Sequence, residues 1–388
     1  MQIADRREWT NIGKYDVVVV GGGIAGVSAA VAAGRLGKKV LLLEKSIFLG
    51  GLATNGLISW FEPLCDGCGN QMIWGIGQEL MELATKYGFD SLPKEWKERN
   101  GTANERTGRY ASFFSPTIFA MALDEFVRES GGNILFDCLV TYPVMEDNHC
   151  SGLVFETIEG KNFVEAGVII DATGTACILE KAGIPVEAGL NYLNYTVHEI
   201  RKEDLERYKE QGKDIGKLRK WKSIGGDYTG KGQPKEVSPI SGLTGKEVTE
   251  FVLLGRKMMF DCIKKEEKDC RDIMMLPGIP QFRTIRHLKG AAVFRGQKQA
   301  ADFIGKCGDF RKRGCQYEIP YGALYHEAFD NILAAGRIIS VDKEGWEISR
   351  VIPVCALTGQ AAGVAASLAI EKKAAVKDVS AHEIREML

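Results

Sequence analysis

Three glycines, Gly21, Gly23 and Gly26, follow the apolar run at residues 17–20 with the spacing G-x-G-x-x-G. The first permits a tight turn, the second lets backbone amides approach a pyrophosphate, and the third lets a helix pack on the strand. Ile24 and Ala25 lie within this glycine loop, and the helix that follows it would face bound phosphate with its positive dipole end. The pattern predicts a nucleotide site, and its alternative is a merely tight glycine turn.

Glu44 lies 23 residues after Gly21, at the end of a second apolar run, and Lys45 follows it. A carboxylate at this position can accept hydrogen bonds from both ribose hydroxyls of a dinucleotide. The strand, the glycines, the helix, the second strand and the acidic residue therefore follow one another in the order and at the spacing of a dinucleotide-binding motif. The fingerprint does not by itself separate NAD(H) from FAD.

The elements that must hold these residues follow from the hydrophobic pattern. Residues 17–20 and 40–43 predict buried parallel strands, and residues 27–36 predict the helix between them, which completes a βαβ unit. Further helices are expected at 77–87, 116–129 and 353–370, with short strands between 133 and 165 and a buried strand at 168–170. Residues 89–112 are expected to form an irregular insertion.

Three further segments resemble flavoproteins of the glutathione-reductase structural class. Gly50-Gly51-Leu52-Ala53-Thr54 resembles their second glycine pair, Ala172-Thr173-Gly174 their strand-ending Ala-Thr-Gly, and Gly336-Arg337 the end of their late strand. The resemblance implies an FAD cofactor and an oxidoreductase. The predicted cofactor-binding residues outside the first fingerprint are Gly50, Gly51, Leu52, Thr54, Val140, Ala172, Thr173, Gly174, Gly336, Arg337 and Val351.

A narrower resemblance is to the FAD-dependent oxidoreductase family that includes a heterodisulfide-reductase flavin subunit. Residues 64–69, 283–290 and 350–363 carry it, and the last stretch matches that family's closing helix. Thr284 stands where the family often has Glu, His287 where it often has Arg, and Trp346-Glu347 replace a small or histidine-bearing stretch. We therefore expect the flavin side to be retained and the substrate side to differ.

The closing helix, starting near Pro353, would direct its positive dipole end at a flavin. Reduced flavin carries negative charge at N1 and O2, which a helix N-terminus stabilises within its first turn. The family implies this placement. The alternative is an ordinary core helix packed through Ala and Gly.

Four residues are the predicted catalytic set, namely Arg283, Arg286, His287 and Arg350. Arginine can hold a carboxylate bidentately or stabilise an anionic flavin, and its alternatives here are an ion pair or a bond to loop carbonyls. His287, beside two arginines, would stay neutral and act as a base, unless it is merely structural.

Tyr321 and Glu347 are weaker candidates, as a donor to a substrate oxygen and as a general base. Cys65 and Cys68 have C-x-x-C spacing, which fits either a dithiol that exchanges electrons with the flavin or an incidental pair in a loop. No further ligands lie nearby in sequence, so no metal site is expected.

Composition narrows the class of protein. Hydrophobic residues make up 45% of the chain and charged residues 26%, as in soluble globular proteins, and a net charge of −1 gives no general attraction to nucleic acid. The ten cysteines form no regular framework, which indicates a reducing compartment. The apolar stretch at 351–370 contains polar residues and glycines and reads as a buried helix rather than a membrane span. A cytoplasmic protein is expected.

These observations predict an α/β fold with a discontinuous Rossmann-like FAD-binding domain at 14–182 and 326–388 and an inserted α+β substrate or cap domain at 183–325. The expected function is hydride exchange between flavin N5 and a small organic substrate, with electrons passing to oxygen, a quinone or a protein partner. No second G-x-G-x-x-G marks an NAD(P)H domain. The alternatives are a nicotinamide-dependent dehydrogenase, a flavoprotein with non-redox chemistry such as hydration or isomerisation, and a scaffold that holds flavin structurally.

Overall fold

The structure is a computed structural model and describes residues 9–92, 111–211 and 215–388. Its centre is a parallel sheet in which β5 (Asn133–Leu135), β2 (Val40–Leu43), β1 (Thr10–Val20), β8 (Gly160–Asp171) and β16 (Ile332–Ala334) lie in that order. The β-branched run at the end of β1 is fully buried, because strands and helices cover it on all sides. This confirms the predicted α/β class.

The first half of β8 leaves the parallel sheet and pairs antiparallel with β7 (His149–Thr157), which in turn pairs with β6 (Leu139–Glu146). The long strand β8 thus pairs with two strands on the same side, with β7 along its first half and with β16 along its last three residues. The strands predicted between 133 and 165 are confirmed as β5, β6, β7 and the start of β8.

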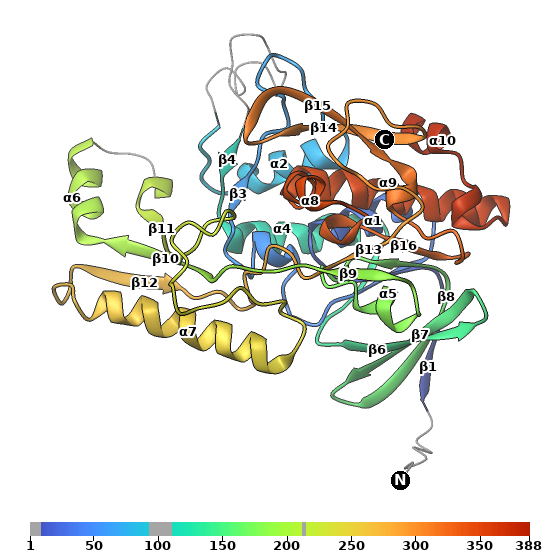
Figure 1. The fold of residues 1–388 in the computed structure, drawn as a ribbon, viewed down its shortest axis with the longest axis horizontal. Helices are drawn as coiled ribbons and strands as arrows, with labels where there is room; N and C mark the ends of the chain where they lie inside the picture. Colours follow the sequence, from blue (N-terminus) through green and yellow to red (C-terminus); the bar gives the residue numbers. More distant parts are fainter. Residues whose placement is uncertain (1–8, 93–110, 212–214) are drawn as a thin grey trace.

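Helices cover the sheet, and Figure 1 shows α1 (Ile24–Arg35) and α9 (Ile352–Lys372) crossing near its centre. They approach to backbone contact: a Cβ added at Gly359 would lie 2.1 Å from the Ala25 carbonyl oxygen. The helices α2 (Ile76–Lys86) and α4 (Pro116–Glu129) pack beside them. By length and composition α9 is apolar enough to cross a membrane, but 94% of its apolar window is buried inside the protein, as predicted for a core helix.

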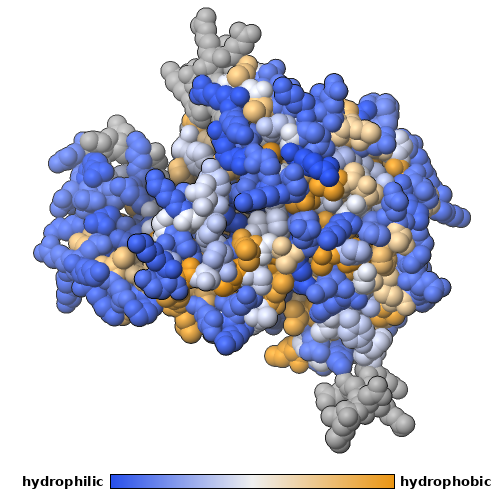
Figure 2. Space-filling view, in the orientation of Figure 1, coloured by the Kyte–Doolittle hydropathy of each residue, from blue (hydrophilic) through white to orange (hydrophobic). Residues whose placement is uncertain are grey.

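The middle of the chain builds a smaller antiparallel sheet, β11-β10-β12, seen with α7 toward the lower left of Figure 1. Its parts are β10 (Asn194–Arg201), α6 (Lys202–Gln211), β11 (Arg219–Gly225), α7 (Gly245–Ile263) and β12 (Arg271–Met275). A capping box starts α7, since the Thr244 side chain accepts from the Glu247 amide and Glu247 bonds back. Figure 2 shows hydrophilic side chains over most of this face, including the α6 region.

The remaining elements connect the two parts. They are β3 (Trp60–Phe61), β4 (Ser112–Phe113), α5 (Cys177–Lys181), β9 (Val186–Ala188), β13 (Arg286–Leu288), β14 (Phe303–Asp309), β15 (Lys312–Pro320), α8 (Lys343–Ser349) and α10 (Ala381–Glu386). Short 3-10 turns lie at Gly51–Ala53, Ile215–Lys217, Tyr321–Ala323, Gly336–Ile338 and Val376–Asp378. Most of the predicted irregular insertion, residues 93–110, lies outside the described residues.

The main hydrophobic core joins segments from both ends of the sequence with part of the expected cap. Phe294, Ile304, Ile319 and Leu324 belong to the same buried cluster as the facing sides of α1 and α9. A separate small cluster, in which Met259 of α7 packs with Tyr195 and Val197 of β10, holds α7 on the antiparallel sheet. The division of the chain at residues 183 and 325 stays a prediction.

Candidate active site

The first glycine turn shows that its glycines serve different purposes. Gly21 has φ +100°, and a Cβ there would lie 2.6 Å from the Ala172 carbonyl oxygen. A Cβ at Gly26 would lie 1.8 Å from the Gly21 oxygen, so the turn and the helix touch through backbone. Gly23, by contrast, has no atom within 4 Å of its added Cβ and borders a cavity. An open approach to backbone amides at a helix N-terminus fits a bound diphosphate.

Glu44 follows β2 and is fixed by backbone amides on both oxygens. Oε2 accepts from Gly22 N at 2.6 Å and Oε1 from Ser46 N at 2.8 Å, and the residue is 8% exposed. Each carboxylate oxygen can accept a second hydrogen bond, so the group can still receive ribose hydroxyls. Glu44, Lys45 and Ser46 all border the cavity.

The second glycine pair lies against the first. Gly50 N donates to Gly22 O at 2.8 Å, and Gly50 and Gly51 have φ +96° and +56°. Leu52 follows at the cavity wall, whereas the Thr54 hydroxyl donates to Leu49 O and is buried away from it. Two turns 29 residues apart in sequence therefore form one cradle.

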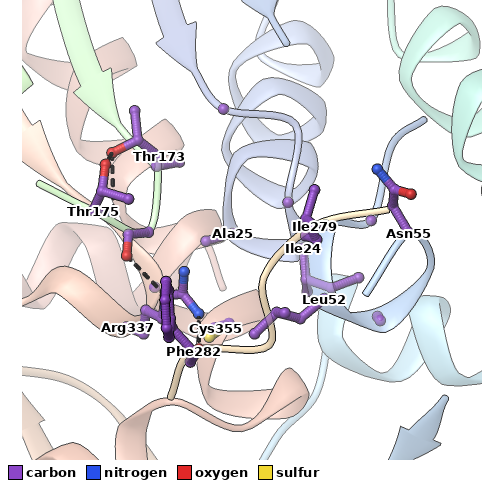
Figure 3. A pocket seen from close by; sticks show the side chains of 18 of the residues that line it. Ile24, Ala25, Leu52, Asn55, Thr173, Thr175, Ile279, Phe282, Arg337 and Cys355 are labelled. Atoms are coloured by element: carbon purple, nitrogen blue, oxygen red, sulfur yellow. Dashed lines mark hydrogen bonds between the residues drawn. The ribbon is translucent and has the colours of Figure 1, made fainter. Parts of the chain in front are cut away.

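The predicted Ala172-Thr173-Gly174 segment forms the opposite wall and is tied to Arg337 (Figure 3). Arg337 Nε donates to Gly174 O at 2.8 Å and Nη1 to Phe282 O at 2.6 Å. Burial lowers the pKa of Arg337 to about 10, so it remains charged at neutral pH. Since these two hydrogen-bond partners are neutral carbonyls, Arg337 adds positive charge to the cavity wall.

The first turn of α9 closes the cavity. Ile352 and Cys355 line it, no acidic residue lies in this turn, and no side chain of the helix caps it. The Ile352 amide donates to the Glu62 carboxylate and the Cys355 amide to the Val351 carbonyl, so the positive charge at this end comes from the helix dipole, which can stabilise a reduced flavin. Gly336, with φ +78°, packs on Ala25 and donates to the Thr358 hydroxyl at 3.0 Å, which holds the three segments together.

The cavity has a volume of about 300 Å³ and gathers most of the predicted cofactor residues. Those lining it are Gly21, Gly23, Ile24, Ala25, Glu44, Lys45, Gly50, Gly51, Leu52, Ala172, Thr173, Gly174, Gly336 and Arg337. Four others lie outside the lining, namely Gly26, Thr54, Val140 and Val351. Gly26 acts through packing, Val140 pairs with Phe155 inside β6, and Val351 is the buried N-cap of α9.

Several lining residues were not predicted. Val248 in α7, the loop residues Gly242, Ile279 and Pro280, and Phe282 come from the middle of the chain, and Figure 3 shows Ile279 near Leu52. Asn55 and Thr175 also line the cavity and extend predicted motifs by a residue. Only Asn55 and Thr175 could have been found from the sequence, because they adjoin predicted motifs. The lining residues from the middle of the chain belong to no glycine fingerprint.

Of the predicted catalytic residues, Arg350 reaches the cavity. It is the C-cap of α8, and its Nε and Nη2 donate to Glu347 Oε2 at 3.0 and 2.6 Å. Arg283 lies close by without lining the cavity. Burial lowers its pKa, the charge of Arg350 lowers it further, and the charges of Glu347 and Asp227 raise it.

Arg286 and His287 lie elsewhere. Arg286 pairs with Glu180 and donates through Nε to Thr175 O at 3.0 Å, which is the ion-pair alternative. His287 is 6% exposed, its Nδ1 lies 2.9 Å from Leu288 O, and its ring meets Trp346 edge-on at 4.6 Å. Arg286 begins β13 and Arg283 lies in the irregular segment before it, so the two do not share a helix face.

The weaker candidates are also structural in this geometry. The Tyr321 hydroxyl is buried and donates to Val376 O at 2.5 Å. Cys65 is buried and Cys68 exposed, both are free thiols, and burial raises the pKa of Cys65 to about 12. Neither cysteine lines the cavity, so the dithiol interpretation gains no support from it. Within the described ranges, no group of three His, Cys, Asp or Glu residues is arranged to hold a metal ion.

One acidic residue was missed by sequence reasoning. Glu62 follows β3, and its Oε2 accepts from Ile352 N at 3.3 Å. Burial raises the pKa of Glu62 to about 7, against the lowering effects of its own amide, of Arg350 and of the Ile352 amide. No motif marks this position, and only the fold brings it to α9.

The described residues fit FAD in three respects. Gly23 leaves open space at the α1 N-terminus, Glu44 retains acceptor capacity beside it, and the positive end of the α9 dipole borders the same cavity. A dinucleotide with an anionic reduced ring needs each of these features.

Comparison with solved structures supports the fold. The crystal structure of p-nitrophenol 4-monooxygenase PnpA from Pseudomonas putida DLL-E4 aligns with a TM-score of 0.54 at 12% identity, covering 94% of this chain and 82% of that one. At this identity the likeness concerns the fold alone.

Curated relatives match over part of their length. Digeranylgeranylglycerophospholipid reductase 2 of Methanothermobacter thermautotrophicus is 28% identical over 183 residues, which are 44% of this chain and 42% of the relative. The tRNA uridine 5-carboxymethylaminomethyl modification enzyme MnmG of Bacillus thuringiensis is 29% identical over 170 residues, which are 42% of this chain and 25% of the relative. The matches thus span less than half the length of these relatives.

The family comparison covers more of the chain. The model of the FAD dependent oxidoreductase family matches residues 16–214 and 299–388, which include both glycine turns, the Ala-Thr-Gly segment and α9. The match extends over more than half of the sequence and agrees with the cavity geometry. The chain belongs to the FAD dependent oxidoreductase family, and FAD is its cofactor.

Proposed function

We propose that this enzyme exchanges a hydride between flavin N5 and a carbon atom of a small organic substrate that carries an acidic group. Bound FAD supplies the two-electron chemistry. The observation that supports the redox assignment is the meeting of the α1 turn, Glu44 and the first turn of α9 at one cavity. In this proposal α1 holds the diphosphate, Glu44 holds the ribose, and the α9 amides hold negative charge.

The acidic group on the substrate is inferred from Arg283. Its guanidinium is half-buried, and within the described part of the chain no carboxylate forms an ion pair with it, because Glu347 bonds Arg350 instead. A partly desolvated cation is stabilised by an anion that can bond it bidentately. Arg350, held by Glu347 at the cavity wall, adds a second positive charge on the same side.

Two catalytic predictions are not carried into this proposal. Neither Arg286 nor His287 lines the cavity, and both are bound to neighbouring groups, so neither receives a chemical step. Glu347 stays in the proposal as the residue that positions Arg350, rather than as a general base.

The experiment is an anaerobic screen in which FAD-loaded protein is mixed with hydroxy acids, amino acids and neutral sugars while flavin absorbance is followed. We expect bleaching by a member of the acidic classes, and Arg283→Met should raise the half-bleaching concentration at least about tenfold, which corresponds to roughly 1.4 kcal/mol of lost binding. Glu344→Gln, a change at a residue paired with Arg311 on the surface, is the control.

Different results point to other functions. Bleaching by neutral sugars with an unaffected Arg283→Met variant would contradict the acidic substrate but not the redox role. A substrate that is converted without any bleaching would instead indicate the non-redox alternative, hydration or isomerisation. The family assignment favours FAD over the nicotinamide-dependent alternative.

Four finer expectations remain proposals. They are the relation to the glutathione-reductase class and heterodisulfide-reductase flavin subunit, a cytoplasmic location, an electron acceptor that is oxygen, a quinone or a protein, and the absence of nucleic-acid partners. We also propose that residues 294–324 belong with the FAD-binding unit, since their buried side chains share its core.

A further inference from the structure

The N-terminus of α9 receives its acidic partner from a distant part of the chain. Glu62 lies 290 residues from Ile352, and its Oε2 accepts the Ile352 amide at 3.3 Å. The helix has no acid in its own first turn and no side-chain cap. Ile352 lines the cavity, so the Glu62 carboxyl group lies at the same positive helix end that borders the cavity.

The surroundings of Glu62 allow it to exist with or without a proton near neutral pH. Burial raises its pKa to about 7, while Arg350 and the Ile352 amide oppose the shift. The other titratable neighbour is Cys355 in α9, whose pKa burial raises to about 12, so it is neutral. Part of the Glu62 surface remains accessible, which lets a proton reach it.

We propose that Glu62 takes up one proton when FAD is reduced and releases it when FAD is reoxidised. The inference rests on the proposed redox function and deepens it. Two electrons and one proton enter FAD with the substrate's hydride, and the further proton comes to Glu62 from solvent. It compensates the negative charge that arrives at the α9 N-terminus, where a carboxylate would otherwise compete with that charge for the same amides.

The test is potentiometry of FAD-loaded wild type and Glu62→Gln from about pH 6 to pH 9, a range that brackets the raised pKa of Glu62, about 7. Glutamine keeps an oxygen for the Ile352 amide but cannot ionise, so the helix contact is retained and the proton is lost. Above pH 7, the wild type takes up one extra proton, on Glu62, for every two electrons. Its midpoint potential should therefore fall more steeply with pH, by about 30 mV more per pH unit. The variant should lack this extra slope.

The direction follows from the charge states. Below the Glu62 pKa of the oxidised protein both redox states hold the proton, and the two lines should run parallel. Above it, only the reduced state holds the proton until the raised pKa of that state is passed. Glu344→Gln, whose carboxylate pairs with Arg311 rather than with the α9 N-terminus, should retain the wild-type slope.

Equal slopes in wild type and Glu62→Gln would overturn the inference, as would loss of the extra slope in Glu344→Gln. If Glu62→Gln does not fold, infrared redox difference spectra of the wild type decide. A protonated carboxylic acid band that appears on reduction and shifts in D₂O is expected, and its absence would refute the proposal. A wild type that binds no FAD would instead contradict the proposed function itself.

Discussion

At the scale of single residues, glycines three positions apart act through different physics. Because Gly26 has no side chain, α1 can contact the Gly21 carbonyl. Because Gly23 has none, a space remains beside it that no described residue fills. One glycine is therefore needed for the fold and the other for the ligand, although both belong to the same fingerprint.

Alanine substitutions should separate these roles. Gly23→Ala adds a Cβ with no neighbour within 4 Å at φ −65°, so we expect a change in unfolding free energy within about 0.5 kcal/mol but at least about tenfold weaker FAD binding. Gly26→Ala should cost about 1–3 kcal/mol and weaken binding as well. Urea unfolding of apoprotein and FAD titration measure the two effects.

The matched control is Gly245→Ala, whose added Cβ also meets nothing within 4 Å but lies at the start of α7. Gly245→Ala should change neither the free energy of unfolding nor the affinity for FAD. Equal losses of stability in Gly23→Ala and Gly26→Ala would show that the open space at Gly23 is not a ligand site.

His198 makes stability depend on pH. It is fully buried, its Nε2 lies 3.0 Å from Leu57 O, and Nδ1 has no partner within the described residues. Burial, and then the charge of Arg219, lower its pKa to about 4. The folded state therefore binds fewer protons than the unfolded chain, and stability falls as pH drops from about 6.5 toward 4, by up to about 3 kcal/mol.

We expect His198→Gln to lose less stability than the wild type between pH 7 and about pH 4.5, because glutamine has no proton to take up on unfolding. Urea unfolding at both pH values gives the difference, and buried acids such as Asp171 contribute equally to both proteins. His382→Gln, at an exposed position in α10, serves as the control and should follow the wild type. An unchanged pH dependence in His198→Gln would contradict this account.

At the scale of elements, the crossing of α1 and α9 positions the site. Gly359 and Gly363 allow backbone contact, since added Cβ atoms would lie 2.1 Å from Ala25 O and 2.4 Å from Ala29 O. Each helix presents its N-terminus to the same cavity as a result. A small displacement of α9 therefore moves the amides that face FAD, even though Gly359 itself lies behind the cavity wall.

Gly359→Ala should push these helices apart. We expect a loss of about 1–3 kcal/mol in unfolding free energy from overpacking, together with weaker FAD binding. Because the added Cβ would meet the backbone of Ala25 and not its side chain, Ala25→Gly should restore neither quantity. Unfolding by urea and titration with FAD measure the two effects, and an unchanged stability of Gly359→Ala would refute the close contact of the helices.

At the scale of the whole molecule, the cavity exists only because distant segments meet. Its walls come from the N-terminal turns, from Val248 and Phe282 in the middle of the chain, and from Gly336 and Ile352 near the end. The core that unites α1 and α9 with residues 294–324 fixes this arrangement. A ligand bound at such a junction stabilises all the segments it touches.

Removal of FAD should accordingly lower the melting temperature of the entire chain. At free FAD one hundred times its Kd, binding to the folded state alone adds about 2.7 kcal/mol. Thermal unfolding of apoprotein with increasing FAD should show a rising Tm in the wild type and a smaller rise in Gly23→Ala at the same concentrations. If the Tm does not change as FAD is added, the cofactor does not bind where these segments meet.

The sequence by itself determined the βαβ unit, the positions of α4 and α9 and most of the residues that line the cavity. These depend on short-range spacing, since glycines, a strand and a helix within about thirty residues specify their own geometry. The same reasoning misplaced His287, because two neighbouring arginines say nothing about the strand and the Trp346 ring that enclose it. It also gave no signal for Glu62, whose pKa and contact with Ile352 arise across 290 residues. Tertiary structure decided these points because burial and charge at a side chain depend on whichever distant segments the fold brings against it.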